Sequence, residues 1–414
     1  MTKKVTATIL FVDIMDSLEI ANYLDTRKYS DFLNEFQYTM LRGILLHKQK
    51  IRKAKLAGDE LVVFYYSKDI AEDIVSAIEL ANTLKILWYI GIINRKRIRE
   101  GKKILDLGVG INTGQVINEY RPSMTELKSL FPRSKSIEGL PISLAKRIEG
   151  FSRQGRYSRI MIGHRTMAEL NKTYHNYDYQ PMGLQKFKGI AQQIPVFELK
   201  SCYSYDAEAM AEYKNLNWAI KQLERIKVFD PSNIWLLMTL IDVYSNRRNY
   251  RKVENLCREA LAVDDSVSNI NHELGISLEE QKKYEEAVAY FNKAISLKRN
   301  SWESYIMKSS SLIFLGYYDE AIKTCEYAIK NIPNNLKKMF CDALYYNIAS
   351  AYARSGNSNK AISNLRKSVE IGGKRTLSVI KKDKDGDFRN LHENIEFRKI
   401  LKGEIRTKHK KQKK

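Results

Sequence analysis

The chain has 414 residues, of which 44% are hydrophobic and 29% are charged. This length predicts roughly two to three domains, and the composition favours globular cores over a fibrous or disordered chain. Four cysteines that lie far apart are too few for a disulfide scaffold and do not have the spacing of metal ligands. The most apolar stretch, residues 86–93, is far shorter than the roughly 20 residues of a membrane span. We therefore expect a cytoplasmic protein with no membrane partner.

The net charge is +22, from 70 basic and 48 acidic residues. The last stretch, residues 402–414, carries seven basic residues and one acidic residue. We predict a disordered basic tail there, with a weak contact with nucleic acid or anionic lipid as the alternative. The sequence contains no nucleic-acid-binding motif with interleaved aromatic residues, so we do not expect nucleic acid to be a partner.

Strands and helices alternate along the first half of the chain. The expected elements, in chain order, are a strand at 5–14, a helix at 17–48, a hairpin at 51–66, a helix at 68–95, a strand at 104–117, a helix at 141–153, a strand and short helix at 159–170, and a final hairpin at 181–200. Together they predict an α+β domain built on one sheet.

The second half contains an internal repeat of 34 residues. Ala219, Val253, Ala287 and Ala321 are each 34 residues apart, and Ala361 follows after an insertion of six residues. Helix pairs with this period and small residues at fixed points are typical of tetratricopeptide repeats, which stack into an all-α solenoid. We expect the concave face of this solenoid to bind a protein or peptide, with structural support alone as the alternative.

These patterns divide the chain into five predicted segments. The alternating strands and helices give way to the repeats just after residue 200. The segments are an α+β domain at 1–200, a linker at 201–210, helical repeats at 211–371, a C-terminal helical cap at 372–401, and the basic tail at 402–414.

Two aspartates occupy strand ends in the first domain. Asp13 lies at the end of the apolar strand, and Asp59 lies next to Gly58 at the tip of the first hairpin. An isolated carboxylate at the end of a buried strand is costly to desolvate, so packing alone explains it poorly. Two aspartates that converge at neighbouring strand ends would offer oxygen ligands to Mg²⁺ or Mn²⁺ bound to phosphates. Aspartates also occur in turns and caps, so neither residue is decisive alone.

Five segments, taken in their order, resemble one family. They are LFVDIMDS, KLAGDELVVF, LGVGINTGQVI, EGLPISLAKRIEG and LQKFKGI. Each is degenerate alone, but the ordered set is similar to the class III nucleotide cyclases over about residues 5–200. The resemblance implies a ferredoxin-like core sheet with helices, and a head-to-tail homodimer with two active sites at its interface. It also implies conversion of a nucleoside triphosphate into a 3′,5′-cyclic nucleotide and pyrophosphate.

The resemblance assigns roles to individual residues. Asp13 and Asp59 of one chain, helped by the Ile14 carbonyl, would bind two ions per site, either Mn²⁺ or Mg²⁺. Those ions would favour attack of the ribose 3′-hydroxyl on the α-phosphorus. Arg147 of the other chain would contact the charge that develops there, because a guanidinium stays charged and fixed in direction. Lys188 would hold the terminal phosphates. Outside this ordered set, Arg147 and Lys188 would be read as solvated surface residues.

Three positions depart from the family pattern. An Asp-Ser-Leu sequence beginning at Asp16 replaces the usual Gly-x-Thr, and Asp16 would either bind metal, or face solvent or cap the next helix. Ser143, four residues before Arg147, replaces the asparagine that orients the ribose or the intermediate. Its hydroxyl has a shorter reach, which puts the turnover rate in question more than the reaction. Ser136 stands where adenylate cyclases carry Asp or Thr, and would face the base together with Lys55.

Two classes of function remain open. The leading hypothesis is an active cyclase, a phosphorus–oxygen lyase, fused to a tetratricopeptide solenoid. The other is a catalytically inactive cyclase-like domain that serves as a dimerisation, nucleotide-sensing or scaffold module. The retained Asp13, Asp59, Arg147 and Lys188 favour the enzyme, because an inactive copy has no physical need for such costly charges.

The choice of base rests on fewer residues. Lys55 is only a donor, so it suits adenine N1, uracil O4 or cytosine N3 and disfavours the guanine N1–H. The stretch at 94–114, the VDIMDS variant and the GDE sequence resemble the antiphage pyrimidine cyclases of the Pycsar group. That resemblance implies cUMP or cCMP as the product, with UTP ahead of CTP, and an effector that kills or arrests the infected cell. The alternative is an adenylate cyclase with a regulatory solenoid, which makes cAMP, as Lys55 suggests, although Ser136 could accept from the adenine amino group only weakly.

Overall fold

The computed structural model describes residues 3–119, 136–173, 175, 177–201, 216–383 and 386–404. The chain divides into two compact units. The first comprises residues 1–248 with 262–264, and the second comprises residues 249–261 with 265–414. Residues 202–210 of the predicted linker and 405–414 of the predicted basic tail lie outside the described residues.

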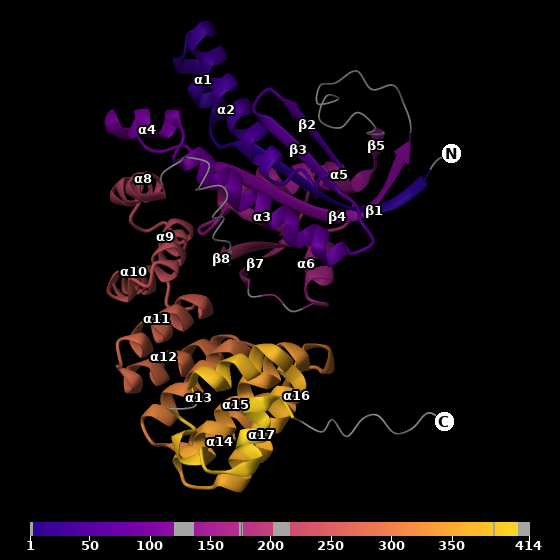
Figure 1. The fold of residues 1–414 in the computed structure, drawn as a ribbon. Coiled ribbons are helices and arrows are strands. Elements are labelled where there is room, and N and C mark those ends of the chain that lie inside the picture. The colour runs from indigo at the N-terminus through magenta and orange to yellow at the C-terminus, as the bar shows by residue number, and fades with distance from the viewer. Residues whose placement is uncertain are drawn as a thin grey trace. The chain divides into compact units, whose positions relative to one another are not determined.

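One sheet forms the centre of the first unit (Figure 1). Its strands are β1 (Lys3–Ile14), β2 (Lys53–Ala57), β3 (Glu60–Tyr65), β4 (Leu107–Glu119), β5 (Ser136–Glu138), β6 (Ile160–Gly163), β7 (Asp178–Gln185) and β8 (Ile194–Ser201). Their order is β2-β3-β1-β4-β6-β8-β7, with β5 paired to β4. Only the β4–β6 pair among these described strands is parallel. The predicted α+β domain with one sheet is confirmed.

The helices of this domain are shorter than the sequence predicts. They are α1 (Ser17–Tyr23), α2 (Thr26–Leu46), α3 (Ile70–Tyr89), α4 (Ile92–Arg99), α5 (Leu140–Gly150) and α6 (His164–Leu170), with a 3₁₀ turn η1 (Phe151–Gln154) after α5. The single helix expected at 17–48 is wrong, because Asp25 starts a new helix by accepting a hydrogen bond from the Lys28 amide at 2.8 Å. The helix expected at 68–95 is likewise divided, with Gly91 preceding α4.

The two faces of β1 pack against different helices. Ala7, Ile9 and Phe11 belong to a buried cluster that includes Ala145 of α5. Side chains alternate along a strand, so Asp13 lies on this same face. The intervening residues face the other side of the sheet, where α3 is buried along most of its length.

Glycines in β4 bring α5 close to the sheet. Gly108, Gly110 and Gly114 pair with Asp13, Phe11 and Ala7 of β1, so they line the face that α5 covers. A methyl group built on Gly110 would lie 2.3 Å from the Glu149 amide nitrogen, inside the backbone of α5. The glycine spacing of the LGVGINTG segment therefore follows from helix–sheet packing.

The first helical hairpin of the predicted repeats belongs to the first unit. It consists of α8 (Leu216–Phe229) and α9 (Ile234–Asn246). The indole of Trp235 on α9 donates to Asn82 Oδ1 of α3 at 3.1 Å, and its ring centroid lies 5.0 Å from that of Tyr89. The Asn233 amide also donates to the Tyr89 hydroxyl at 3.2 Å. This hairpin therefore packs on the helix layer of the α+β domain.

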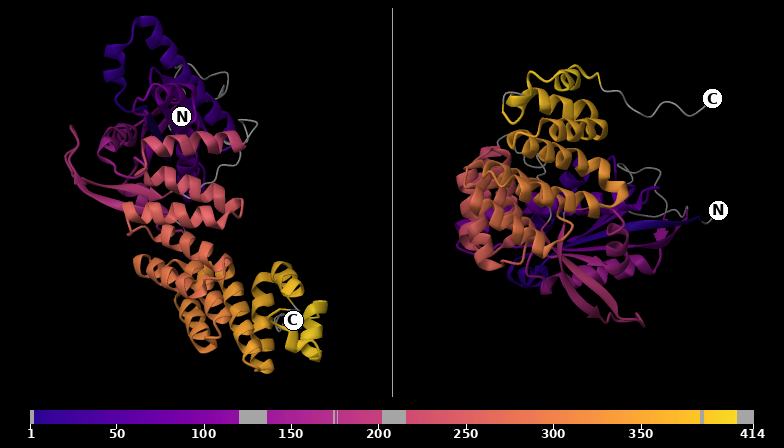
Figure 2. Two further views of the ribbon diagram at one scale, coloured as in Figure 1. Left: turned by 90° about the vertical axis from the view of Figure 1, so that its left-hand side faces the viewer. Right: turned by 90° about the horizontal axis from the view of Figure 1, so that it is seen from below.

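The second unit is all helical, as predicted. Its elements are α10 (Tyr250–Val263), α11 (Ser268–Glu280), α12 (Tyr284–Leu297), α13 (Trp302–Phe314), α14 (Tyr318–Asn331), η2 (Asn334–Leu336), α15 (Lys337–Arg354), α16 (Ser358–Asp383), η3 (Arg389–Leu391) and α17 (Ile395–Lys402). Successive helices lie side by side in Figure 2. The 34-residue period falls on buried small side chains at Val253, Ala287 and Ala321. The expected insertion lies at η2 and the start of α15, which has 18 residues where α13 has 13.

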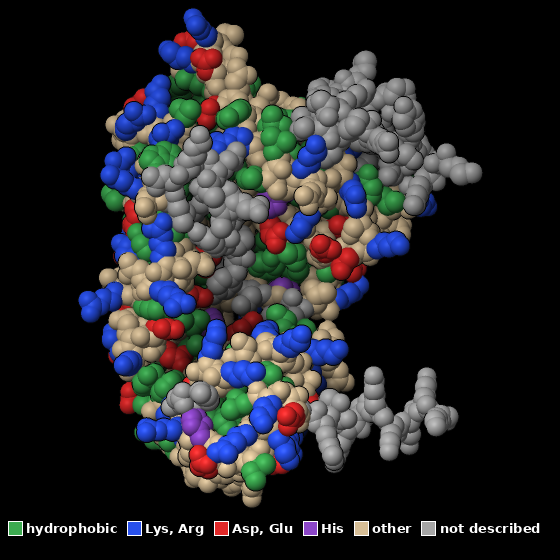
Figure 3. Space-filling view, viewed as in Figure 1, with side chains coloured by type: hydrophobic (Ala, Val, Ile, Leu, Met, Phe, Trp, Pro, Cys, Tyr) green, Lys and Arg blue, Asp and Glu red, His purple; other side chains and the backbone are tan. Residues whose placement is uncertain are grey.

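The surface of the second unit carries mixed charge. On the face seen in Figure 3, its Lys and Arg side chains are interspersed with Asp and Glu. Several of these form ion pairs, such as Arg258 with Glu254 at 2.9 Å and Lys283 with Glu254 at 2.9 Å. Mixed charge of this kind is typical of a solvated face.

None of the described helices alone is long and apolar enough to cross a membrane. The pair α3 and α4, bent by 43°, has the length and composition of a broken span, but α3 is mostly buried in the first unit.

Candidate active site

Asp13 is held at the end of β1, on the face that α5 covers. It pairs with Glu60 of β3 on one side and with Gly108 of β4 on the other. Its Oδ1 atom is buried and has no hydrogen-bond partner among the described residues. Burial, followed by the charge of Asp59, raises the pKa of Asp13 to about 7. The Ile14 amide and the charge of Arg153 lower this pKa, but they do not offset the effect of burial.

Asp59 lies in the turn between β2 and β3, beside Asp13. The turn requires Gly58, whose φ of +60° is rarely adopted by other residues. Gln37 of α2 donates a side-chain hydrogen bond to the Gly58 carbonyl at 3.1 Å and so holds the tip. The charge of Asp59 raises the pKa of Asp13, so the structure brings together the two aspartates predicted from the sequence.

The end of β1 is fixed by its neighbours. Ile14 pairs with Leu107 of β4, and the Met15 amide donates to the Asp106 carbonyl at 3.0 Å. The Ile14 amide is hydrogen-bonded to the Asp13 carboxylate. Asp16 precedes α1 with a left-handed φ of 62° and is exposed, and its side chain makes no capping hydrogen bond among the described residues. This exposure agrees with the expectation that Asp16 faces solvent, while a role in metal binding stays a prediction.

Glu149 of α5 is a carboxylate near Asp13 that sequence reasoning missed. It is 5% exposed, and its Oε1 has no hydrogen-bond partner among the described residues. Burial, followed by the charge of Asp13, raises the pKa of Glu149 to about 8. A methyl group built on Gly108 would lie 2.7 Å from this Oε1, which places Glu149 above the strand position opposite Asp13. The sequence feature that could have indicated Glu149 is Gly108, which leaves room for a side chain of α5 next to Asp13.

Two basic residues lie near this acidic group. Lys146 of α5 forms an ion pair with Glu60, next to Asp59 in the chain. Arg153 of η1 lowers the pKa of Asp13 and of Glu149 by its positive charge, a smaller effect than burial. The neighbourhood of Asp13 therefore contains more carboxylates than cations, as expected of a cation site.

Arg147 points to a different part of the domain. A methyl group built on Gly189 would lie 3.7 Å from its Nη2 and 3.9 Å from its Nη1. Gly189 is in the loop between β7 and β8, next to the exposed Lys188. The Nη1 atom of Arg147 is buried and has no hydrogen-bond partner among the described residues. The structure thus brings Arg147 close to the loop of Lys188.

The predicted site residues therefore form two groups. Asp13 and Asp59 lie at one end of the β1–β3 pair, whereas Arg147 lies against the β7–β8 loop. Within the described part of the chain, no hydrogen bond or ion pair joins Arg147 or Lys188 to either aspartate.

The remaining predicted site residues are Ser143, Lys55 and Ser136. Ser143 is exposed on α5, one turn before Arg147. Lys55 is half-buried on β2, opposite Val62. Ser136 begins β5, where its backbone pairs with Glu119, but its side chain lies outside the described part of the structure.

The donor set at Asp13 suits a hard divalent cation. Among the described residues, no three His, Cys, Asp or Glu side chains gather as a metal cluster. Two aspartates and the Ile14 carbonyl supply only part of a coordination shell, which phosphate oxygens and water commonly complete for Mg²⁺. The buried Oδ1 of Asp13, which has no partner among the described residues, is suited to bind such a cation.

Family models match both halves of the chain. Residues 1–201 match the family model of the adenylate and guanylate cyclase catalytic domain. Tetratricopeptide repeat models match residues 268–301, 303–335 and 343–371. The N-terminal half of the chain is a class III nucleotide cyclase domain, whose family uses divalent metal ions. The whole chain is this domain followed by tetratricopeptide repeats.

Solved structures and one curated relative resemble parts of the chain. The adenylyl cyclase CyaB from P. aeruginosa is 20% identical, covering 50% of this chain and 98% of that one, with a TM-score of 0.40. The guanylyl cyclase Cya2 is 20% identical over 49% and 96%, with a TM-score of 0.38. YrrB, a tetratricopeptide protein with an unusual peptide-binding site, is 21% identical over 43% and 88%, with a TM-score of 0.36. The Hsp70-Hsp90 organising protein of Plasmodium falciparum (isolate 3D7) is 31% identical over 121 residues, and the chain spans about a fifth of its length.

Proposed function

We propose that the protein converts a nucleoside triphosphate into a 3′,5′-cyclic nucleotide and pyrophosphate. The observation that carries this proposal is the buried, unpartnered Oδ1 of Asp13 at a strand end beside Asp59. An uncompensated carboxylate is costly to bury, so its retention is best explained by a ligand that the chain itself lacks. The cyclase family of the domain supports a metal-bound triphosphate as that ligand.

The metal would be held by Asp13, Asp59 and the Ile14 carbonyl, with two Mn²⁺ or Mg²⁺ ions per site. When bound, these ions supply neutralisation of the triphosphate charge and a lower pKa for the ribose 3′-hydroxyl. Asp13 has a raised pKa, so it would release its proton when it takes up this role near neutral pH. Lys146 neutralises Glu60 and so limits repulsion beside the two aspartates.

The reaction is an in-line displacement at the α-phosphorus. A bond forms from the 3′-oxygen to that phosphorus as the bond to the bridging oxygen of the β-phosphate breaks, and the hydroxyl proton passes to solvent. Arg147 would contact the negative charge that develops there, and its unpartnered Nη1 is available for that contact. Lys188 would hold the terminal phosphates, and Ser143 would hydrogen-bond to the ribose or the intermediate.

A site shared between two copies of the chain accounts for the two groups of residues. Asp59 and Arg153 are among the charges that act on Asp13, whereas Arg147 lies near Gly189, which follows Lys188 in the chain. In a head-to-tail homodimer, the aspartates of one protomer would meet Arg147 of its partner at each of two sites. The separation supports this assembly, because a single chain does not join the two groups by any described hydrogen bond or ion pair.

For the base, we propose a pyrimidine, with UTP ahead of CTP. Lys55 is half-buried on β2, and it presents only donors, which suit the uracil carbonyls. The product would then be cUMP, a cytoplasmic signal in antiphage defence, read by an effector that arrests or kills the cell. Adenine is the alternative base.

A competition experiment tests this choice. The purified chain is incubated with equal concentrations of the four nucleoside triphosphates and Mn²⁺, and the cyclic products are separated by mass. Predominant cUMP supports the proposal. Predominant cAMP contradicts both the pyrimidine and the defence role, while leaving the cyclase reaction itself intact.

The repeats of the second unit are proposed to bind a protein or peptide. Tetratricopeptide helices stack into a curved surface suited to an extended segment, and matches to this family cover residues 268–371 apart from short gaps. Such a partner would regulate the cyclase domain or its dimerisation.

A further inference from the structure

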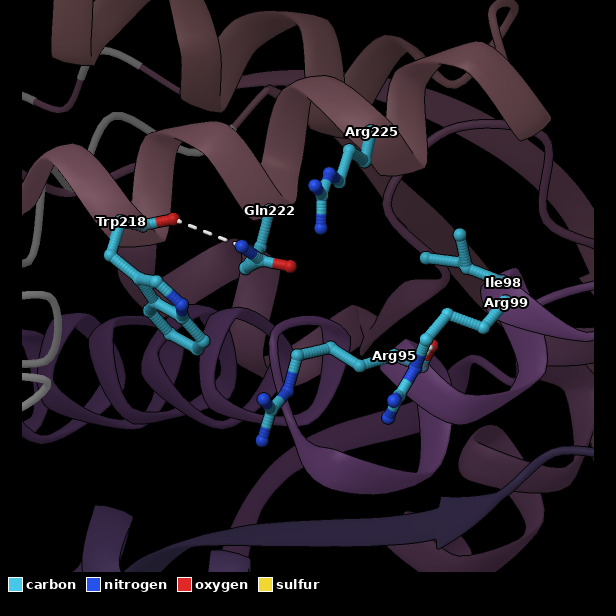
Figure 4. Close-up of a pocket in the computed structure, with 6 residues that line it drawn as sticks. All are labelled: Arg95, Ile98, Arg99, Trp218, Gln222 and Arg225. Carbon is cyan, nitrogen blue, oxygen red and sulfur yellow. Dashed lines mark hydrogen bonds between the residues drawn. The ribbon is translucent and has the colours of Figure 1, made fainter.

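A pocket lies between α4 and α8, within the first unit and apart from the candidate active site. It has a volume of about 210 Å³ and is lined by Arg95, Ile98 and Arg99 from α4 and by Trp218, Gln222 and Arg225 from α8. Figure 4 shows these side chains around the space between the two helices. None of the residues assigned above to the cyclase reaction lines it.

Three arginines line this pocket. Within the described residues, no carboxylate forms an ion pair with Arg95, Arg99 or Arg225. Among the described residues, the buried Nε of Arg95 has no hydrogen-bond partner, and the side chain of Arg99 donates only to the Arg95 carbonyl, at 3.4 Å. Like charges gathered at one place repel each other, so this arrangement favours an anion from outside.

The pocket is also shaped by uncharged groups. The guanidinium carbon of Arg95 lies 5.1 Å from the ring centroid of Trp218, a cation–π contact that holds it at the pocket wall. Gln222 is 7% exposed, and its Nε2 makes only a weak 3.5 Å hydrogen bond to the Trp218 carbonyl. A buried amide with so weak a bond retains the capacity to donate to a ligand.

We infer that this pocket binds a small molecule through an oligophosphate group. Guanidinium groups present forked donors that match phosphate oxygens in pairs, and they stay charged at any physiological pH. Three such groups suit a ligand with several negative charges better than a single carboxylate. Because the donors come from α4 and α8, the ligand would join the first helical hairpin of the repeats to the cyclase domain.

The chain itself contains a competing anion. The sequence between β8 and α8 includes the carboxylates Asp206, Glu208 and Glu212. These could neutralise the three arginines without any ligand. A sound test therefore has to separate a bound oligophosphate from this acidic segment.

Binding of inorganic pyrophosphate to the full chain is measured by calorimetry in EDTA. All proteins carry Lys188→Ala, so that the candidate active site contributes little. The test variant is Arg95→Gln/Arg99→Gln/Arg225→Gln. The matched control is Lys96→Gln/Lys103→Gln/Lys221→Gln, which removes the same charge from α4, α8 and the adjoining loop outside the pocket. ADP is titrated in parallel, to distinguish a free oligophosphate from a nucleotide.

We expect one site whose pyrophosphate affinity falls by about tenfold or more in the pocket variant and by less than about twofold in the control. Tighter ADP binding would add a nucleoside contact, and equal binding would identify free oligophosphate as sufficient. The single variant Arg225→Gln, at an exposed position, keeps the test valid if the triple variant fails to fold. Equal losses in pocket and control variants would overturn the proposal. Binding seen only after Asp206→Asn/Glu208→Gln/Glu212→Gln would overturn it as well, because the arginines would then serve the chain's own carboxylates.

Discussion

Lys85 of α3 and Asp106, the residue before β4, form a buried ion pair with an Nζ–Oδ1 distance of 2.5 Å. Arg159 donates to the other carboxylate oxygen at 3.0 Å. The Lys85 ammonium lies 5.2 Å from the ring centroid of Trp235 on α9. Helix α9 therefore covers a charged network that fixes the start of β4, and the Asp106 carbonyl in turn accepts from the Met15 amide behind Asp13.

The first prediction concerns the packing of α9 on the Lys85–Asp106 ion pair. Trp235→Ala should destabilise the cyclase domain by about 3–5 kcal/mol, because it removes a large buried side chain and exposes the buried pair. Hydrogen exchange along α3 should accelerate with it. Tyr23→Ala, at an 89% exposed position, is the control and should change little. If Trp235→Ala accelerates exchange only in the repeats, the hairpin α8–α9 is not part of the cyclase unit.

The second prediction concerns the contact of β4 with α5. Gly110→Ala should destabilise the domain and lower turnover, since the new methyl group would lie 2.4 Å from the Ala145 carbonyl oxygen and displace the helix of Arg147. Gly150→Ala is a matched control, because nothing lies within 4 Å of the added methyl group. Thermal unfolding of both variants checks this. A Gly110→Ala protein as stable as the Gly150→Ala protein would contradict the close packing.

The third prediction is a pH dependence. The folded chain holds the pKa of Glu149 at about 8, against 4.5 ordinarily. Between these values the folded state binds the proton more tightly than the unfolded state, so stability falls as pH rises. In EDTA, Glu149→Gln should flatten this fall and be more stable than the parent at pH 8. Glu19→Gln, at an exposed position, should leave the profile unchanged. A parent and Glu149→Gln protein with the same pH profile would contradict the burial of Glu149.

Much of this fold can be predicted from local patterns in the sequence. The apolar run of β1, the Gly58–Asp59 turn and the 34-residue spacing each involve residues close together in the chain, and all three are confirmed. The break at Asp25 was not predicted, although Asp is a residue type that commonly caps the start of a helix.

Long-range contacts were beyond such patterns. Glu149 lies near Asp13 only because β4 glycines let α5 approach the sheet. The repeat period places Ala219 correctly at a buried position, yet it gives no sign that Trp235 also packs on α3. One face of a helix can pack within the repeats while another face packs against a different domain.

The fourth prediction follows from a shared site. Asp13→Ala and Arg147→Ala chains should each be inactive, and an equal mixture should recover about a quarter of parental activity, because half of the dimers are mixed and each has one intact site. Activity is measured after mixing, with mixed dimers verified by two different tags. Mixed dimers without any recovered activity would rule out a site built from two chains.

The most direct test of the cyclase assignment is turnover by the purified chain with each of the four nucleoside triphosphates and Mn²⁺. We predict that at least one of them yields equal amounts of pyrophosphate and a 3′,5′-cyclic nucleotide. Asp59→Ala, at a turn outside the core, should remain folded and lose more than about tenfold in rate, or about 1.4 kcal/mol of barrier lowering. No pyrophosphate from any triphosphate, or a folded Asp59→Ala protein within tenfold of the parent, would contradict the account.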